Sequence, residues 1–187
     1  MFPRLIDIQR LRNNVLHSCI ARRGLVSAAV LATTFSAMVT ASPQASAASS
    51  RGDIAVTVLR LINSERAAHR VPLLRMNAKL VAAARGHNLA MSSANSMTHQ
   101  VAGEANFARR ISAVKYRWRA AAENVGSTTD TSVNGALGLQ SFMYNETAPA
   151  NGHRLNILNR KFREVGIDVL VDDSGRLWLT EDFGRSR

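Results

Sequence analysis

The sequence predicts an α+β fold in which helices cover an antiparallel β-sheet. Beyond residue 50, apolar residues in the first half of the chain recur every three or four positions, the period of an amphipathic helix. Near the C-terminus they alternate with other residues on both sides of an Asp-Asp-Ser-Gly turn, which is typical of a β-hairpin. Helical segments come mostly first and strands mostly last, and this order favours an antiparallel sheet covered by helices over a βαβ array.

The first 47 residues have the pattern of a signal peptide. Five arginines and one acidic residue lie within residues 1–23, an uncharged apolar run occupies residues 25–39, and an Ala-Ser-Ala cleavage motif ends at Ala47. The apolar run is shorter than the roughly 20 residues that span a bilayer, so a transmembrane helix is the weaker alternative. Arg22-Arg23 also resembles a twin-arginine export signal, although paired arginines are commoner in ordinary secretory signals. We therefore expect a single mature domain, residues 48–187, that is secreted or periplasmic and has no transmembrane segment.

Composition excludes several classes of protein. Apolar residues make up 46% of the chain, far more than in a disordered protein, and the single cysteine lies in the segment expected to be removed. A domain of this size buries enough surface to be stable without disulfides or an obligatory metal. It carries 19 basic and 12 acidic side chains, and outside the cytoplasm such a protein meets anionic lipids and envelope polymers. No groove-reading motif accompanies the charges, so nucleic acid is not an expected partner.

Each element is predicted from a local signal. Helical spacing predicts a first helix from Asp53, which can cap its first turn, to His69, and Pro72 ends it. Asn77 can cap a second helix that runs to about Ser93. A short helix, a strand, a Ser/Thr/Gly-rich loop, a fourth helix and the C-terminal hairpin are expected at residues 105–114, 116–125, 126–134, 135–145 and 165–180.

Two of the four histidines in the mature chain have a structural interpretation. His69 lies at the end of the first predicted helix, where a cation interacts favourably with the helix dipole. His87 lies on the packed face of the second predicted helix, where a buried, hydrogen-bonded histidine is expected. His99 and His153 differ, because each lies in a loop-like segment with a carboxylate or a helix start close by. These two are the candidate functional histidines.

Two carboxylates are candidates to accompany them. Glu104 follows His99 by five residues, and Glu123 ends a predicted strand from whose edge it can project toward either histidine. The sequence contains no His-Glu-x-x-His, Cys-x-x-Cys or EF-hand loop. Ser141 is not expected to be a nucleophile, since no Gly-x-Ser-x-Gly element surrounds it.

Five short elements in the right order resemble the CAP superfamily of cysteine-rich secretory, antigen and pathogenesis-related proteins, in its cysteine-free bacterial branch. The likeness covers roughly residues 54–184. The elements are Leu61-Ile62-Asn63-Ser64-Glu65-Arg66, the stretch from Leu80 to His99, Ala122-Glu123-Asn124-Val125, Gly152-His153-Arg154-Leu155-Asn156-Ile157-Leu158, and the closing Phe162, Val165-Gly166 and Asp182-Phe183-Gly184. Three positions depart from the family pattern: Arg70 stands where a helix-ending glycine is usual, Ala122 replaces a glycine, and Ala150-Asn151 replace Ser-Pro.

The resemblance implies both a fold and a site. The fold is a three-layer α-β-α sandwich with a central antiparallel sheet. The site is a cleft tetrad of two histidines and two glutamates, which falls on His99, Glu104, Glu123 and His153 when it is carried over by position. Imidazole nitrogens and carboxylate oxygens are ligands that zinc accepts, so zinc is the expected ion, and it is not required for folding.

Two functions remain open at this point. In the favoured one, the protein is a secreted, non-enzymatic binding module whose His/Glu cleft holds a divalent metal and a small lipid or anionic envelope component, since the resemblance extends to relatives that bind sterols or other lipids. In the alternative, the same cleft belongs to a metal-dependent, peptidase-like hydrolase, with Glu123 as the candidate base for a metal-activated water.

Overall fold

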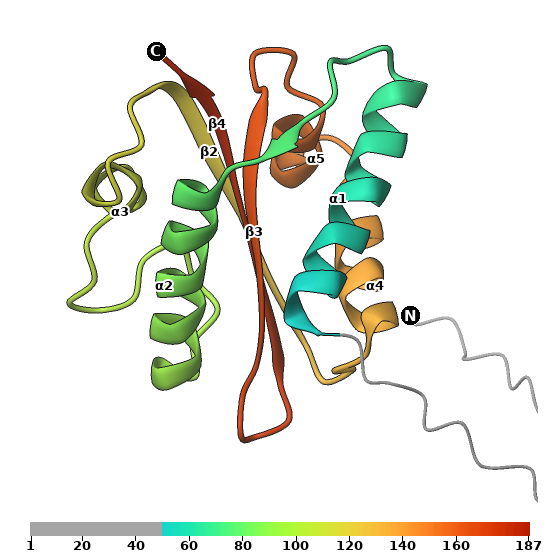
Figure 1. Ribbon diagram of the computed structural model, residues 1–187. Coiled ribbons are helices and arrows are strands. Elements are labelled where there is room, and N and C mark those ends of the chain that lie inside the picture. The colour runs from blue at the N-terminus through green and yellow to red at the C-terminus, as the bar shows by residue number, and fades with distance from the viewer. Residues whose placement is uncertain (1–49) are drawn as a thin grey trace, which may run out of the picture. The chain divides into compact units, whose positions relative to one another are not determined.

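The computed structural model describes residues 50–187 (Figure 1). The expected signal peptide and its cleavage motif lie outside the described residues. Within residues 50–187, no helix combines the length and the apolar character needed to cross a membrane. The elements are α1 (Arg51–Ala68), β1 (Arg75–Met76), α2 (Ala78–Ala94), α3 (Phe107–Ala113), β2 (Trp118–Thr128), α4 (Val133–Tyr144), α5 (Gly152–Ile157), β3 (Glu164–Val171) and β4 (Leu177–Ser186).

A four-stranded sheet forms the middle of three layers. Its strand order is β1-β3-β4-β2, so β2 is an edge strand. Figure 1 shows α1, α4 and α5 on one face of the sheet and α2 and α3 on the other. The structure therefore confirms the α+β class and the helix-sheet-helix layering.

The sheet is mixed rather than wholly antiparallel. β4 pairs antiparallel with both β2 and β3, but the two-residue β1 runs parallel to β3. The Arg75 amide donates to the Arg163 carbonyl at 3.0 Å, and the Asn77 amide donates to the Val165 carbonyl at 2.9 Å. The segment that connects α1 and α2 thus forms the edge strand β1 through these backbone hydrogen bonds. A strand of two residues is too short to show an alternation of apolar and polar residues, so no sequence pattern predicts β1.

Of the two predicted helix caps, Asn77 is confirmed and Asp53 is corrected. α1 begins at Arg51, two residues before the predicted start, with Ser50 as its N-cap, and Asp53 is the reciprocal partner of Ser50 in a capping box. Asn77 caps α2 as predicted, because its side-chain oxygen accepts from the Lys79 amide at 3.0 Å. Arg70, which stands in place of the family's helix-ending glycine, adopts a left-handed backbone with φ of 54°.

β2 extends further than the sequence predicts. Its last three residues, Gly126 to Thr128, pair with Leu179 to Leu177 of β4, although their composition is typical of a loop. A Cβ on Gly126 would lie 2.9 Å from the Met143 Cε atom, so the absence of a side chain lets α4 approach the strand. Tertiary packing therefore overrides the local turn signal here.

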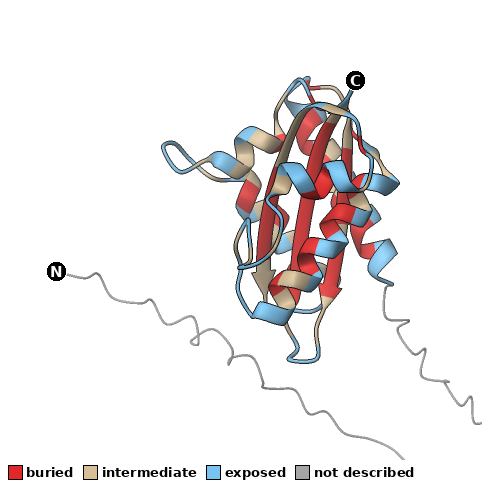
Figure 2. Cartoon of the chain, turned by 90° about the vertical axis from the view of Figure 1, so that its left-hand side faces the viewer, coloured by how far each residue is buried: buried red, intermediate tan, exposed pale blue. Residues whose placement is uncertain are grey.

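Apolar side chains fill both spaces between the sheet and the helices, and the strands are buried along most of their length (Figure 2). On the α1 side, Phe162 stacks on Phe183 with ring centroids 5.8 Å apart. On the α2 side, Leu80 is fully buried and packs in one cluster with Ile111 and Tyr116. These contacts fix α2 and α3 over the sheet and so position the loop between them.

Gly166 sets how closely α2 packs on β3. A Cβ at this position would lie 2.0 Å from the Leu80 carbonyl carbon, which is backbone and cannot swing away. We expect Gly166→Ala to lower the free energy of unfolding by about 3 kcal/mol, as overpacked cores do. Urea unfolding followed by circular dichroism measures this.

Gly86→Ala is the matched control on the same helix. Gly86 is exposed within α2 and a Cβ there meets nothing within 4 Å, so alanine should stabilise the protein by about 1 kcal/mol. Equal stabilities of the two variants would contradict the close approach of α2 to β3.

Candidate histidine–carboxylate site

His87 is a buried structural histidine, as predicted. It lies on the inner face of α2 with no exposed surface. Its Nδ1 lies 2.9 Å from a carboxylate oxygen of Glu104, and its Nε2 lies 2.9 Å from the carbonyl oxygen of Thr98. Both ring nitrogens therefore have partners, and the imidazole pins the loop that follows α2.

Glu104 belongs to the same buried network. In addition to His87, its carboxylate accepts from the Val101 amide at 3.2 Å and from Nη1 of Arg110 at 3.4 Å. Within residues 50–187, no hydrogen bond joins its side chain to His99, Glu123 or His153. The structure thus places Glu104 behind the loop as an anchor for His87.

Glu123 holds the first candidate histidine. It lies in the middle of β2, it is buried, and its Oε1 is 3.0 Å from Nδ1 of His99. Its other oxygen accepts a hydrogen bond from Nη2 of Arg110. Arg110 also donates to the carbonyl of His99 at 3.0 Å, so it fixes both partners of the pair. The His99 side chain itself is 60% exposed, so Glu123 orients one edge of the ring while the rest of the ring is open to solvent.

His153 has its own carboxylate, Glu146. Nδ1 of His153 lies 2.5 Å from Oε1 of Glu146, and the other oxygen accepts from the His153 amide at 2.9 Å. Glu146 is not among the residues that the sequence predicts for the site. The one available signal is that it is the only acidic residue between Asp130 and Glu164 and therefore the only local partner for His153.

The two histidine segments meet at the edge of the sheet. Asn124 follows Glu123 in β2, and its side-chain amide donates to the His153 carbonyl at 3.4 Å. Asn156, one turn further along α5, donates to the Glu123 carbonyl at 3.3 Å and to Oδ1 of Asn124 at 2.9 Å. The structure therefore brings the segments of His99, Glu123 and His153 to one stretch of β2.

The charges of the site lower the pKa values of both orienting carboxyls. Burial alone would raise the pKa of Glu123, but the His99 hydrogen bond and the nearby charges of Arg110 and His87 outweigh it. Glu146 behaves in the same way, with His153 as the main opposing partner. Both side chains are therefore ionised near neutral pH. The hydrogen bond to Glu123 in turn raises the pKa of His99.

Two buried acids lie behind the site on β4. Asp182 lies opposite Glu123 in the register of β2 and β4. Neither of its carboxyl oxygens has a hydrogen-bond partner among the described residues. Burial, reinforced by the charge of Glu123, raises its pKa well above the usual range. Glu181, the preceding residue of β4, faces the opposite side of the sheet. Its Oε2 accepts a hydrogen bond from the Asn124 side chain at 3.2 Å, and burial raises its pKa to about 8. Burial thus disfavours the charged form of both side chains.

The donor atoms that remain free decide what the site can hold. Among residues 50–187, no three His, Cys, Asp or Glu side chains stand close enough together to form a metal site by themselves. No hydrogen bond within those residues reaches Nε2 of His99 or Nε2 of His153. Each of these nitrogens belongs to a ring whose Nδ1 faces a carboxylate, the arrangement that commonly orients metal-binding histidines. Each histidine therefore presents one oriented ring nitrogen that has no hydrogen-bond partner among the described residues.

Comparisons with known proteins agree with this architecture. Residues 59–183 match the model of the cysteine-rich secretory protein family, CAP. No curated protein sequence matches the chain. Among solved structures, an extracellular Bacillus anthracis protein containing an SCP domain is similar over 73% of this chain and 41% of its own length, with 25% identity and a TM-score of 0.62.

Two further structures share the fold at lower identity. An outer surface protein of Borrelia burgdorferi is 15% identical over 74% of this chain and 97% of its own, with a TM-score of 0.63. A structure titled NaASP2 with Zn²⁺ is 12% identical over 72% of this chain and 81% of its own, with a TM-score of 0.52.

Arg110 is expected to be essential for stability. Replacing it by Met leaves the buried carboxylate of Glu123 without its cation, and breaking a buried ion pair in this way costs about 3 kcal/mol or more. Arg109→Met is the matched control, because the neighbouring side chain is exposed and forms no ion pair within the described residues. Chemical unfolding of both variants measures the difference, and a loss of less than 1 kcal/mol in the Arg110 variant, within the range of surface substitutions, would contradict a buried pair.

The pKa of His99 is expected to lie above its ordinary value of 6.5. Because the folded protein holds this proton more tightly than the unfolded chain, the His99–Glu123 pair stabilises the fold fully below about pH 6.5, and the contribution is lost as pH rises through the raised value. NMR titration of the imidazole measures it. Glu123→Gln should lower the pKa of His99, whereas Asp173→Asn, an exposed change in the β3–β4 turn, should leave it unchanged. A His99 pKa at or below 6.5 in the unmodified protein would contradict the hydrogen bond.

Proposed function

Because the chain belongs to the CAP family of cysteine-rich secretory proteins, we propose that it is an extracellular binding module in which His99 and His153 hold a divalent cation. The observation that carries the proposal is the repeated geometry of the two rings. Each has Nδ1 fixed by a carboxylate and Nε2 without a hydrogen-bond partner among residues 50–187, with Glu123 orienting His99 and Glu146 orienting His153. A carboxylate in this position sets the tautomer and raises the basicity of the free nitrogen.

Zinc is the ion that best suits this donor set. Neutral imidazole nitrogen is a preferred ligand of Zn²⁺, whereas Ca²⁺ and Mg²⁺ favour oxygen ligands. The carboxylates are already occupied by Arg110 and by backbone amides, so they act behind the histidines and leave only nitrogen for the ion. A bound cation would polarise a ligand or a water at the open positions. That a relative of the same fold was crystallised with Zn²⁺ supports the choice.

The same geometry favours binding over hydrolysis. A metal-assisted hydrolase needs a carboxylate that takes a proton from water, and a general base works best when its pKa is close to the working pH. The pKa values of Glu123 and Glu146 are both lowered by their cationic and amide partners. Such carboxylates are weak bases and strong orienting groups. We therefore propose a binding role for the cleft.

Export and partner follow from the same proposal. The relatives are extracellular or outer-surface proteins, and the signal-peptide pattern of residues 1–47 supports the same location for this chain. There the natural partner is a lipid or another anionic component of the cell envelope. The surplus of basic over acidic side chains supports that chemistry.

Isothermal titration with ZnCl₂ tests the cation site. The protein should bind about one equivalent, and His99→Ala and His153→Ala should each weaken binding at least about tenfold without a large fall in melting temperature. His69→Ala is the control, because His69 lies at the end of α1 and bonds to Tyr144 instead. A large loss of stability in the two site variants with no zinc heat in the unmodified protein would favour a purely structural polar cluster.

Two glutamate variants test whether Glu146, which contacts His153 in the structure, or Glu104, which the family resemblance implies, belongs to the cation site. Glu146→Gln should raise the Kd for zinc by about tenfold, since it removes the group that orients His153. Glu104→Gln should change the Kd less, because Glu104 contacts His87 rather than either proposed ligand. The reverse order would support the tetrad that was carried over by position. Turnover of ester or peptide substrates by the zinc-loaded protein would support the hydrolase instead.

A further inference from the structure

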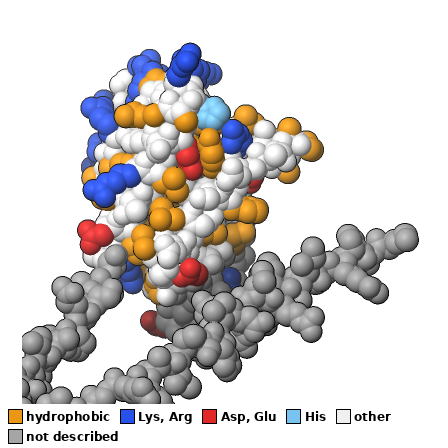
Figure 3. Space-filling view, turned by 90° about the vertical axis from the view of Figure 1, so that its right-hand side faces the viewer, with side chains coloured by type: hydrophobic (Ala, Val, Ile, Leu, Met, Phe, Trp, Pro, Cys, Tyr) orange, Lys and Arg blue, Asp and Glu red, His pale blue; other side chains and the backbone are white. Residues whose placement is uncertain are grey.

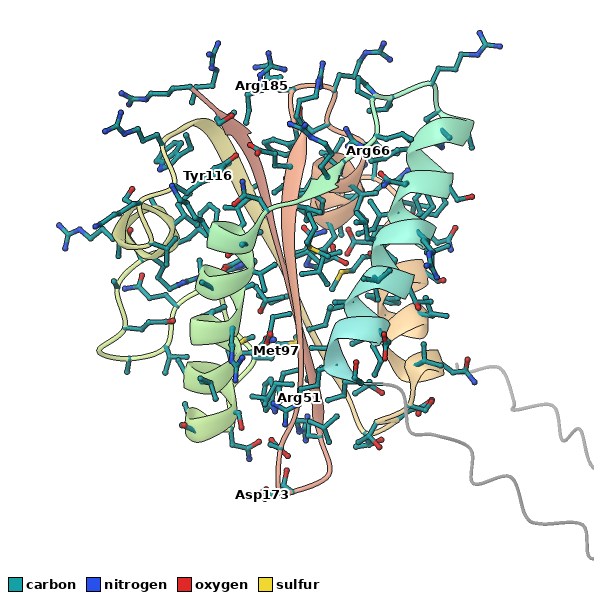
Figure 4. All side chains as sticks on the ribbon, viewed as in Figure 1. Arg51, Arg66, Met97, Tyr116, Asp173 and Arg185 are labelled. Atoms are coloured by element: carbon teal, nitrogen blue, oxygen red, sulfur yellow. The ribbon has the colours of Figure 1, made fainter. Side chains whose placement is uncertain are left out.

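The charge of the domain is concentrated at one end of the sheet. The strand register places Arg75 beside Glu164, Glu164 beside Gly184, and Trp118 beside Ser186, so four chain segments meet there. These segments, residues 70–79, 115–119, 160–164 and 185–187, contain eleven Lys and Arg residues and one acidic residue. Lys and Arg side chains gather toward the upper end of the face in Figure 3, and Figure 4 shows Arg185 at the end opposite Asp173. We call the surface of these four segments the basic end.

The cations of the basic end are not neutralised by the protein. No ion pair within residues 50–187 includes any of the eleven. The one acidic side chain there, Glu164, accepts from the Tyr116 hydroxyl at 2.7 Å and from the Asn77 side chain at 2.9 Å, and its single charge is far outnumbered by the eleven cations. Exposed cations that lie closer together than the Debye length, about 8 Å in physiological salt, repel one another. Such an arrangement costs folding free energy, and a bound anion relieves the cost.

The same end contains two adjoining grooves. Their volumes are about 630 and 460 Å³, and both are lined by Lys115, Tyr116, Arg117 and Arg187. Trp118, half-buried, lines the smaller one. Arg187 donates through Nε to the Trp118 carbonyl at 3.0 Å, which holds its stem while its terminal nitrogens make no hydrogen bond within the described residues. The grooves thus present fixed cations beside an aromatic face.

We propose that the basic end is a docking surface for a phosphate-bearing polymer. Eight of the eleven cations are arginines, whose planar guanidinium groups match phosphate oxygens in paired hydrogen bonds. Two connected grooves suit an extended chain, and the indole of Trp118 offers an apolar face to the uncharged part of a repeat unit. None of the large exposed apolar side chains of residues 50–187 lines the grooves, and Leu73 is the one that lies elsewhere on the basic end, so a charged polymer suits the grooves better than a lipid layer. The inference rests on the proposed function only for the extracellular setting.

Two triple variants with the same change of charge test the surface. Lys115→Gln, Arg117→Gln and Arg187→Gln together remove three cations of the grooves. Arg60→Gln, Arg85→Gln and Arg109→Gln together remove three exposed cations elsewhere. The probe is long-chain inorganic polyphosphate, and the protein is produced from the full chain. At about 0.1 M salt the groove triple should bind at least about tenfold more weakly, with a salt-dependence slope smaller by about 2, whereas the control triple should lose less than about threefold.

Four outcomes would overturn the proposal. Equal weakening by both triples would show a general charge effect, and the absence of polyphosphate binding at low salt would show that the surface binds no such chain. Tighter binding to phosphatidylglycerol vesicles than to polyphosphate would identify a membrane surface as the partner. Equal binding of polyglutamate of matched length would show that phosphate is not selected.

The proposals for the cation site and for the basic end can be tested independently of each other. The groove triple should keep its zinc affinity, and His99→Ala should keep its affinity for polyphosphate, because no hydrogen bond or ion pair within the described residues links the two surfaces. Loss of zinc binding in His99→Ala with polyphosphate binding retained would leave the basic end intact as a proposal. Loss of both activities in each variant would overturn the assignment of two separate surfaces.

Discussion

The buried guanidinium of Arg110 is the contact on which the arrangement of the site depends. It is 8% exposed and it touches the carboxylates of Glu104 and Glu123 as well as the carbonyl of His99. Removing these charges from water costs several kcal/mol per ion, so the pair survives only because nearly every polar atom is hydrogen-bonded. Since Glu104 holds His87 and Glu123 holds His99, one arginine on a short helix aligns two histidines that are twelve residues apart.

The second constraint is the alternation of β2 at the edge of the sheet. Consecutive side chains of a strand point to opposite faces, so Glu123 faces the α3 side while Asn124 faces α5. In an inner strand those two environments would be separated by neighbouring strands. At an edge strand they join around the free side, and Asn124 and Asn156 supply the connection. A site built from both faces therefore needs an edge strand at this position.

The sequence predicts most of the fold because its signals are local. Helical spacing, the Asn77 cap and the alternating hairpin each lie within a few residues, and all are confirmed. β1 and the end of β2 escape prediction for the opposite reason, since their pairing partners lie far away in the chain. The site divides in the same way. His99, Glu123 and His153 stand out by residue type and motif, but which glutamate faces which histidine is decided by tertiary packing. Glu146 meets His153 and Glu104 meets His87, and spacing along the chain cannot reveal either contact.

The ionisation of the surrounding acids explains why the two proposed surfaces suit opposite charges. Burial disfavours the charged form of Asp182 behind Glu123, and Arg110 offsets the charge of Glu123, the carboxylate that orients His99. In the proposed cation site, the free imidazole nitrogens would then receive the ion without competition from Glu123, whose oxygens bond to His99 and Arg110. At the basic end the opposite holds, because eleven cations outnumber the single acidic side chain, Glu164, and repel a divalent ion. The proposed cation site and the proposed polyanion surface therefore share no residues, and on these proposals one domain would bind both at the same time.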